Sequence, residues 1–487
     1  MEPDSNKRVG MVSVVLFFAA IFVANGCTGV ISGSRNENTN AEDWDGATQD
    51  GSVVDGAFSD GFVADPDAGE CIPSCEGVEC GQEDPCGNIC EEGSGCICVP
   101  DCEGKTCGSD NGCGEPCQPG SGCHIPQPEW TFHGQIAEGV QFDAVRGPGD
   151  IIHIVSNRYY QLNASGQVIV DEDQGDGQQN PMHFPPAIAA GDDGTVHIVT
   201  RHEGNVESGF VIRYRRRNTD GTWDSNYVVG SQIKRNYVVA AAWAGIGQVH
   251  MFYSQMGDNV WGPLHFFYEN GGSAATDGLL DNVWRADNHA RMRGRSGTVY
   301  FVSGKGDPDG RAYFSWGSAG AGLSNRLAQN MQQHTAGSGR RSFPDLYIDA
   351  QGDIHFIYGA HHQIYYNRYN DQGQRQLSND GMVFDGLGDW HLSTGLGAVA
   401  ATDDGQTILI VALRSDGSQA ATNSDVLWSF STDAGQTWST PVDSGRKSNA
   451  GEGRRLPRIV ALNNTFFVIY QDNGVSGLSL ATVETVQ

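Results

Sequence analysis

Residues 186–199 read Pro-Ala-Ile-Ala-Ala-Gly-Asp-Asp-Gly-Thr-Val-His-Ile-Val, and residues 344–358 read Pro-Asp-Leu-Tyr-Ile-Asp-Ala-Gln-Gly-Asp-Ile-His-Phe-Ile-Tyr. Each stretch contains a short apolar strand, a turn with Gly and Asp, and a second strand that carries a histidine. The same element recurs at intervals of 44 to 60 residues. Its first strands are expected near Phe142, Pro186, Tyr237, Ala290, Pro344, Gly397 and Pro457.

Each repeat continues into a polar loop, a third strand rich in aromatic residues and a fourth strand. A period of this length with short strands and glycine turns is typical of a radial array of four-stranded blades. The sequence therefore predicts an all-β chain in which residues 129–487 form a β-propeller of about seven blades, with six as the alternative count. The last repeat has only three strand-like runs, so residues 130–136 are expected to return and complete it, which closes the ring and removes exposed sheet edges.

The front of the chain has a different composition. All thirteen cysteines lie between Cys27 and Cys123, and acidic residues greatly outnumber basic ones in residues 28–129, within a chain of net charge -29. A nucleic-acid partner is excluded by this balance, because phosphate binding requires a surplus of Lys and Arg on one face. The propeller region has no cysteine and must be stabilised by burial alone.

The first 26 residues are typical of an export signal. Lys7 and Arg8 precede an apolar run over residues 11–23, which is short for a membrane span. The run ends before Gly26 and Cys27, and this junction resembles the bacterial lipobox. The resemblance implies acylation of Cys27 and an address in the cell envelope, at the surface of the outer membrane. An uncleaved anchor and ordinary signal cleavage are the alternatives. Contact with the membrane is expected through the lipid anchor only.

Residues 27–70 are predicted to be an acidic, flexible linker. Asp-Gly pairs recur every five residues from Asp45, and such a segment cannot bury a core. Calcium ligation by these aspartates is the alternative, although the spacing differs from the twelve-residue calcium loop. No cofactor is otherwise evident, and no metal-binding residue is predicted.

Two copies of one cysteine-rich module follow, at residues 71–97 and 98–124, offset by 27 residues. Each copy has six cysteines and few apolar side chains, so three disulfides per copy are expected, with the connectivity left open. Zinc binding by the thiolates is the alternative. The modules resemble cysteine-rich repeats that precede the working domain in some bacterial surface lipoproteins. The cysteines are Cys71, Cys75, Cys80, Cys86, Cys90, Cys96, Cys98, Cys102, Cys107, Cys113, Cys117 and Cys123.

Residues 431–438 read Ser-Thr-Asp-Ala-Gly-Gln-Thr-Trp, and residues 219–223 read Thr-Asp-Gly-Thr-Trp. The first stretch matches the Asp box of sialidase-like propellers, and the second is a shortened copy, so the chain resembles that superfamily. In the box, Asp accepts hydrogen bonds from turn amides, Gly adopts a left-handed conformation and Trp packs beneath the turn. The resemblance implies that the box joins the third and fourth strands on the face opposite an active site. Its residues are Ser431, Asp433, Gly435, Thr437 and Trp438.

The opposite face is then built from the loops after each second strand and before each first strand. These loops are rich in Arg and His, which suits an anionic sugar because guanidinium groups bind carboxylates in a bidentate fashion. A scattered, solvated rim is the alternative. The repeated strand histidines are interpreted as packing residues, since Leu409 and Phe467 hold the same position in other blades. The loop residues are Arg158, His183, Arg201, His202, His289, Arg291, Arg340, Arg341, His361, His362, His391, Arg454 and Arg455.

The sequence thus predicts a membrane-anchored surface lipoprotein whose propeller binds an acidic glycan and, if it is an enzyme, cleaves it as a glycoside hydrolase or polysaccharide lyase. The substrate-binding residues are expected to be Arg201, Arg341 and Arg455. The catalytic acid or base is expected among His202, His361 and His362. The alternative function is a non-enzymatic propeller platform for protein–protein binding or adhesion, with a surface protein as the partner.

Overall fold

The chain divides into two units, Met1–Cys71 and Ile72–Gln487. The computed structural model describes residues 74–91, 100–105, 109, 111–113, 115, 117 and 128–485. The last range has gaps at 140, 174–184, 204–209, 225–226, 234–238, 246, 257–260, 271–272, 281–288, 305–310, 321, 336–340, 361, 388–392, 395, 415–422, 450–455 and 474–476. The predicted signal, Cys27 and the linker lie outside the described residues. No helix among the described residues has the length and apolar character needed to cross a membrane.

The large region is a β-propeller whose described strands form seven four-stranded antiparallel sheets. Blade 1 comprises β2 (Asp143–Gly147), β3 (Ile151–Val155), β4 (Tyr159–Leu162) and β5 (Val168–Glu172), and blade 2 comprises β6 (Ala187–Ala190), β7 (Val196–Glu203), β8 (Phe210–Arg217) and β9 (Tyr227–Ile233). Blade 3 comprises β10 (Val239–Trp243), β11 (Gln248–Met256), β12 (Trp261–Asn270) and β13 (Ser273–Leu280). Blade 4 comprises β14 (His289–Arg295), β15 (Thr298–Gly304), β16 (Arg311–Ser318) and β17 (Gln332–Thr335).

The remaining three blades follow the same order. Blade 5 comprises β19 (Asp345–Ile348), β20 (Ile354–Ala360), β21 (Gln363–Tyr369) and β22 (Gly381–Phe384), and blade 6 comprises β24 (Leu396–Ala401), β25 (Ile408–Arg414), β26 (Ser424–Ser431) and β27 (Val442–Ser448). Blade 7 comprises β28 (Arg458–Leu462), β29 (Thr465–Gln471), β30 (Gly477–Glu484) and β1 (Glu129–Glu138). A short helix, α1 (Leu323–Gln329), lies between β16 and β17.

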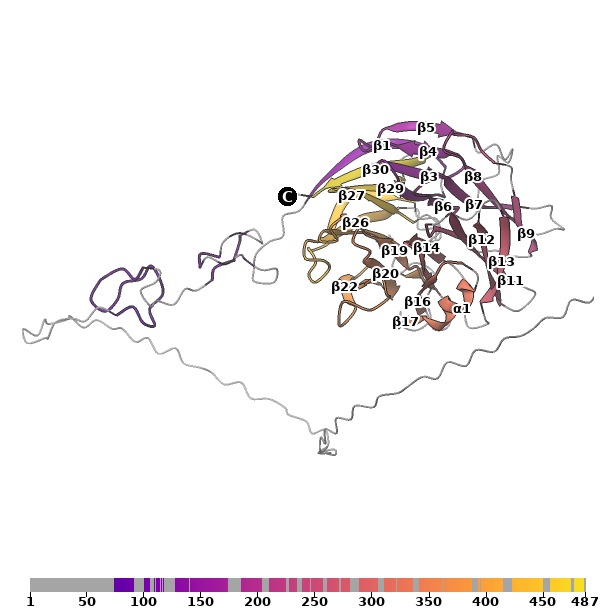
Figure 1. The fold of residues 1–487 in the computed structure, drawn as a ribbon. Coiled ribbons are helices and arrows are strands. Elements are labelled where there is room, and N and C mark those ends of the chain that lie inside the picture. Colours follow the sequence, from indigo (N-terminus) through magenta and orange to yellow (C-terminus); the bar gives the residue numbers. More distant parts are fainter. Residues whose placement is uncertain are drawn as a thin grey trace, which may run out of the picture. The chain divides into compact units, whose positions relative to one another are not determined.

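The ring closes where the first strand of the propeller joins the last blade. Strand β1 pairs antiparallel with β30, and Trp130 lies opposite Val483. Figure 1 shows the purple strand β1 beside the yellow strand β30. The innermost strands then contact one another in a closed cycle, β2, β6, β10, β14, β19, β24, β28 and back to β2. The predicted fold class, the seven inner strands and the return of residues 130–136 are therefore confirmed.

Apolar side chains between neighbouring blades supply the core. One cluster joins Leu409 and Val411 of blade 6 to Phe466 and Val468 of blade 7, all nearly inaccessible to solvent. Each such side chain contributes about 1.5–3 kcal/mol when fully buried. The closed ring therefore needs no disulfide to hold its blades together.

The Asp box lies in the connection between β26 and β27, the third and fourth strands of blade 6. Asp433 Oδ1 accepts a hydrogen bond from the Thr437 amide at 2.9 Å, and Asp433 Oδ2 accepts one from Thr437 Oγ1 at 2.6 Å. Gly435 has a φ of 86°. In the shortened copy, Asp220 Oδ1 accepts the Thr222 amide at 2.9 Å, so in both turns the aspartate bonds the box threonine, across a shorter span in the copy.

The tryptophan of each box packs on the preceding blade. Trp438 meets Tyr366 edge-on with 5.0 Å between ring centroids, and Trp223 meets Tyr159 in the same way at 5.3 Å. Each tyrosine hydroxyl then bonds a strand histidine of its own blade: Tyr366 lies 2.9 Å from Nδ1 of His355, and Tyr159 lies 2.7 Å from Nδ1 of the corresponding histidine in blade 1. The box therefore connects adjacent blades.

The repeated strand histidines are His153, His197, His250 and His355, and all four are buried. Burial lowers the pKa of His153 to about 4 and that of His197 to about 3, so both rings are neutral at pH 7. Their side chains pack between blades, in agreement with the prediction that they are structural.

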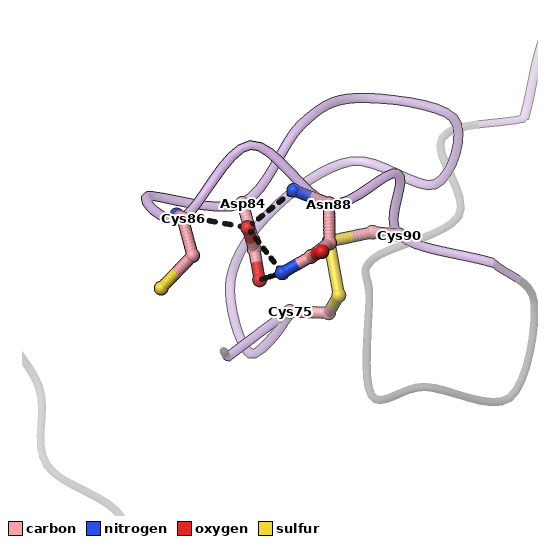
Figure 2. Close-up of a disulfide and its surroundings, with 5 residues drawn as sticks. All are labelled: Cys75, Asp84, Cys86, Asn88 and Cys90. Atoms are coloured by element: carbon pink, nitrogen blue, oxygen red, sulfur yellow. Dashed lines mark hydrogen bonds between the residues drawn. A yellow bond between two sulfur atoms is a disulfide. The ribbon is translucent and has the colours of Figure 1, made fainter. Parts of the chain in front are cut away.

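Two disulfides are described in the cysteine-rich modules, Cys75–Cys90 and Cys102–Cys117. Both pair the second and fifth cysteine of a copy, so the duplication extends to connectivity. Figure 2 shows the first bridge with the turn beside it, where Asp84 Oδ1 accepts the amides of Cys86 and Asn88, each at 2.8 Å. Asn111 holds the same turn in the second copy. The expected disulfides are thus present, and Cys80, Cys86 and Cys113 are also disulfide-bonded.

Candidate functional site

Strand alternation fixes which connections share a face of the propeller. Because the four strands of a blade run alternately up and down, the first–second and third–fourth turns lie at one end, which we call the Asp-box face. The second–third connections and the connections into each first strand lie at the other end, which we call the opposite face. His289 begins β14 and Asp143 begins β2, so both lie toward the opposite face.

Seven equivalent positions encircle the central channel just inside the opposite face. In each blade, the repeated histidine position of the second strand pairs with one residue of the first strand. The equivalent positions are those two residues before that partner, on the first strand. Three of these positions hold alanine and four hold charged residues. The alanines are Ala187, Ala240 and Ala398, and the charged residues, which we call the channel cluster, are Asp143, Arg291, Asp345 and Arg458.

The channel cluster is buried and held together by ion pairs. Arg291 Nη1 lies 2.6 Å from Asp143 Oδ1, and Arg291 Nε lies 3.4 Å from Asp345 Oδ1. Arg458 Nε lies 3.2 Å from Asp143 Oδ1. Since these strands belong to blades 1, 4, 5 and 7, the contacts cross the channel and close it to a ligand that approaches from the opposite face.

Both carboxylates of the channel cluster also bind the next blade. Asp143 Oδ2 accepts the amide of Ile188 at 3.3 Å, and Asp345 Oδ2 accepts the amide of Val399 at 3.4 Å. Burial raises the pKa of Asp345. A buried charge is costly unless it is paired and hydrogen-bonded. The channel cluster pairs its charges, but Arg291 Nε and Nη2 and Asp345 Oδ1 form no hydrogen bond among the described residues.

His289 lies one layer above the channel cluster, on the same side of β14 as Arg291 because strand side chains alternate. Its side chain is buried, and its Nε2 has no hydrogen-bond partner among the described residues. Burial, and secondly the charge of Arg291, lower the pKa of His289 well below its usual value. The ring is therefore neutral at pH 7, with a buried nitrogen that forms no hydrogen bond among the described residues.

The predicted site residues lie at this face where they are described. Arg201 and His202 are near the end of β7, and His202 Nε2 is 2.8 Å from Thr200 Oγ1. His362 lies between β20 and β21. Arg341 starts the two-residue strand β18 (Arg341–Ser342), which pairs in parallel with β23 (Ser393–Thr394) and brings two connections together.

His361 and Arg455 lie outside the described residues, and so does the side chain of Arg341. The roles assigned to these residues, and to Arg201, His202 and His362, stay predictions. His289 and Arg291 were predicted among the loop residues that would suit an anionic sugar, but they lie within strand β14. Asp143, Asp345 and Arg458 were not predicted. They could have been recognised in the sequence as charged residues at equivalent positions of inner strands that are otherwise rich in Ala, Val and Ile.

The described residues contain no group of three or more His, Cys, Asp or Glu side chains arranged to hold a metal ion. The aspartates of the linker, for which calcium was the alternative, lie outside them.

No protein-family model matches the chain, and no curated protein matches its sequence. Among solved structures, it is similar to the Hadza microbial sialidase Hz136, with 10% identity over 69% of this chain and 73% of that chain and a TM-score of 0.39. The sialidase of Trypanosoma rangeli gives 10% identity, 72% and 59% coverage and a TM-score of 0.38. The polysaccharide lyase Uly1 gives 10% identity, 72% and 90% coverage and a TM-score of 0.43. Sialidases are thus among the similar structures, as the Asp box implied, but such distant likenesses identify no activity.

Proposed function

We propose that the propeller binds an acidic glycan at the opposite face, over the mouth of the channel that begins at His289. The observation that carries the proposal is a neutral, buried imidazole with an unpartnered nitrogen directly above a cluster of buried arginines. A carboxylated sugar would meet the positive end of the channel cluster and a hydrogen-bonding ring nitrogen at one place.

Local charge supports an anionic ligand even though the chain is acidic overall. Arg291 and Arg458 share the two aspartates of the channel cluster, and Arg293 lies in the next layer of β14. The two guanidinium groups and two carboxylates of the channel cluster balance, and Arg293 adds one positive charge below them, toward the Asp-box face. Arg201, at the end of β7, adds a positive charge toward the rim.

If the glycan is cleaved, His289 is one candidate to accept a proton, although its lowered pKa makes it a weaker base than an exposed histidine. A neutral imidazole accepts a proton from a carbon next to a uronate carboxylate, while a positive group stabilises the charge that develops there. His202, His361 and His362 remain alternatives for this role. Binding without cleavage needs only the arginines and the ring nitrogen.

Incubation with sialosides and with uronate polysaccharides tests the proposal. New reducing ends indicate hydrolysis, and a product with ultraviolet absorbance from a new double bond indicates lyase chemistry. Glycan retention without product indicates binding alone. His289→Gln and Arg201→Gln should weaken whichever is observed by about 10-fold or more, and Lys447→Gln on β27 should not. Neither retention nor product would contradict the proposal and favour the protein-binding platform.

We also propose that the chain is held to the outer membrane, exposed at the cell surface, by acylation of Cys27. The support is the apolar run before Gly26-Cys27 and the odd cysteine count, which leaves Cys27 without a partner in the duplicated modules. Acyl chains contribute about 0.8 kcal/mol for each buried methylene. Cys27→Ser should move the protein from the membrane fraction to the soluble fraction, and unchanged partitioning would contradict the anchor.

A further inference from the structure

A cavity of about 670 Å³ occupies the channel on the other side of the channel cluster, toward the Asp-box face. Its wall is formed by the inner strands and by first–second turns, including those at Gly191 and Ser296. The channel cluster separates it from the site proposed above. The cavity is therefore a second place where a ligand could be held, and the proposed function does not use it.

The register of the inner strands explains why the cavity is open. At the layer opposite the repeated histidine position, blades 2 and 3 carry Ala189 and Ala242, and blades 4 and 5 carry Arg293 and Tyr347. All four residues line the cavity. Small side chains on one wall thus leave room in front of a guanidinium and a phenol on the other.

Two arginines of β14 contribute charge to this wall. Arg293 donates to the carbonyl oxygens of Met292 at 3.0 Å and Ala144 at 3.5 Å, and Arg295 donates to the carbonyl oxygens of Asp349 and Ala350. Within the described part of the chain, neither forms an ion pair with a carboxylate. They lie two residues apart on one strand and so face the same side.

The other arginine of the cavity is already neutralised. Arg146 lies 2.8 Å from Asp150 and 2.5 Å from Asp403. Asp349 is also engaged, because its Oδ1 accepts the amides of residues 351 to 353 and its Oδ2 is 3.1 Å from His355. Asp192 lines the cavity at an exposed turn. The lining thus carries three carboxylates, those of Asp192, Asp349 and Asp403, as well as three arginines. Among the described residues, Arg146 pairs with carboxylates, whereas Arg293 and Arg295 do not.

Aromatic groups complete the lining with further donors. The buried Nε1 of Trp243 has no hydrogen-bond partner among the described residues. Burial raises the pKa of Tyr347 to about 12, so its hydroxyl keeps its proton at pH 7. A wall of guanidinium, indole and phenol donors suits a ligand rich in acceptor oxygens. Gly294 lets β14 approach β10, because a Cβ there would collide with the carbonyl oxygen of Trp243.

We propose that this cavity binds a small organic anion of one or two rings, with its carboxylate or phosphate held between Arg293 and Arg295. The cavity volume lies in the range of small-molecule sites. Its lining combines apolar side chains with the donors described and with the carboxylates of Asp192, Asp349 and Asp403. The site is separate from the glycan face, so each can be present without the other.

Titration calorimetry of the full chain with glucuronate, glucose 6-phosphate and neutral glucose tests the proposal. At least one of the two anions should bind, and glucose should bind at least about 10-fold more weakly. Arg293→Gln and Arg295→Gln should each weaken the anion by about 10-fold or more. Lys447→Gln removes one positive charge outside the channel and should leave the affinity unchanged. Absence of anion binding, or equal binding of glucose, would overturn the proposal.

Ala242→Leu provides a variant that keeps every charge. Ala242 lines the cavity on β10, the inner strand next to β14, so a leucine there takes up cavity volume beside Arg293. Anion binding should be lost while the circular dichroism spectrum and cooperative unfolding are retained. Anion binding that persists in a folded Ala242→Leu chain would place the ligand elsewhere, including at the glycan face, and would reject this site. If the unmodified chain binds the small anion but does not retain an acidic glycan, only the proposed function is contradicted.

Discussion

Arg291 Nη1 lies 2.6 Å from Asp143 Oδ1, and the two residues belong to blades 4 and 1, which are not neighbours in the ring. Their side chains are only 4% and 1% exposed. The ion pair therefore crosses the channel and divides it into a mouth near His289 and a cavity toward the Asp-box face. This division separates the two anion-binding sites proposed above.

Breaking this ion pair should destabilise the whole ring. Arg291→Met leaves Asp143 buried with Arg458 as its remaining ionic partner, and loss of one member of a buried pair costs about 3–5 kcal/mol. Denaturant unfolding monitored by tryptophan fluorescence measures the change. Lys447→Gln, at an exposed pair on β27, should change the free energy of unfolding by about 1 kcal/mol or less. If Arg291→Met lowers the free energy of unfolding no more than Lys447→Gln does, the ion pair between Arg291 and Asp143 does not stabilise the ring.

The Asp box can be tested with two glycines that share a left-handed backbone. Gly435 has a φ of 86° and a Cβ there would collide with Tyr366, whereas Gly445 has a φ of 70° and open space around it. Gly435→Ala should therefore be less stable than Gly445→Ala by about 1–3 kcal/mol, the usual cost of overpacking. Thermal unfolding of both variants gives the difference. Similar melting temperatures would contradict the contact between the box and the preceding blade.

Acid should destabilise the propeller through its strand histidines. His153 has a pKa of about 4 when folded, below the usual value of about 6.5 when unfolded, so its contribution is complete above pH 6.5 and is lost as pH falls through 4. The shift corresponds to roughly 3 kcal/mol. His153→Phe, which copies Phe467 of blade 7, should reduce the slope of stability against pH in this range. An unchanged slope would indicate that the ring is already protonated in the folded protein.

The cysteine-rich modules predict a specific peptide map. Proteolysis without reduction should yield Cys75 linked to Cys90 and Cys102 linked to Cys117, since both copies use their second and fifth cysteines. Each bridge closes a loop with the same separation of 15 residues, so removal of either should cost a similar free energy, about 3 kcal/mol. Free thiols with bound zinc would instead support the metal-binding alternative.

Features with local signatures could be predicted from the sequence. The turn residues and the recurring histidine located all seven inner strands, and the missing fourth strand of the last repeat pointed to Trp130. The histidine position could be recognised as structural because other blades place Leu409 and Phe467 there. These inferences required only the repeated element, which occurs several times along the sequence.

The centre of the channel could not be predicted in this way. Asp143 contacts Arg291 and Arg458, which are far from it in the sequence and belong to other blades. Such contacts depend on ring closure and on exact strand register, and a shift of one residue would turn these side chains to the other side of the strand. The sequence analysis chose Arg455, three residues before Arg458, because loops were expected to carry the ligand-binding charges.

Hydrogen–deuterium exchange with and without a bound acidic glycan tests the central claim most directly. Residues 199–203 at the end of β7 and residues 289–293 of β14 should exchange more slowly in the complex, while the Asp box at residues 431–438 should be unaffected. Protection confined to the Asp box and to the turn at residues 191–195, with none near His289, would contradict the account.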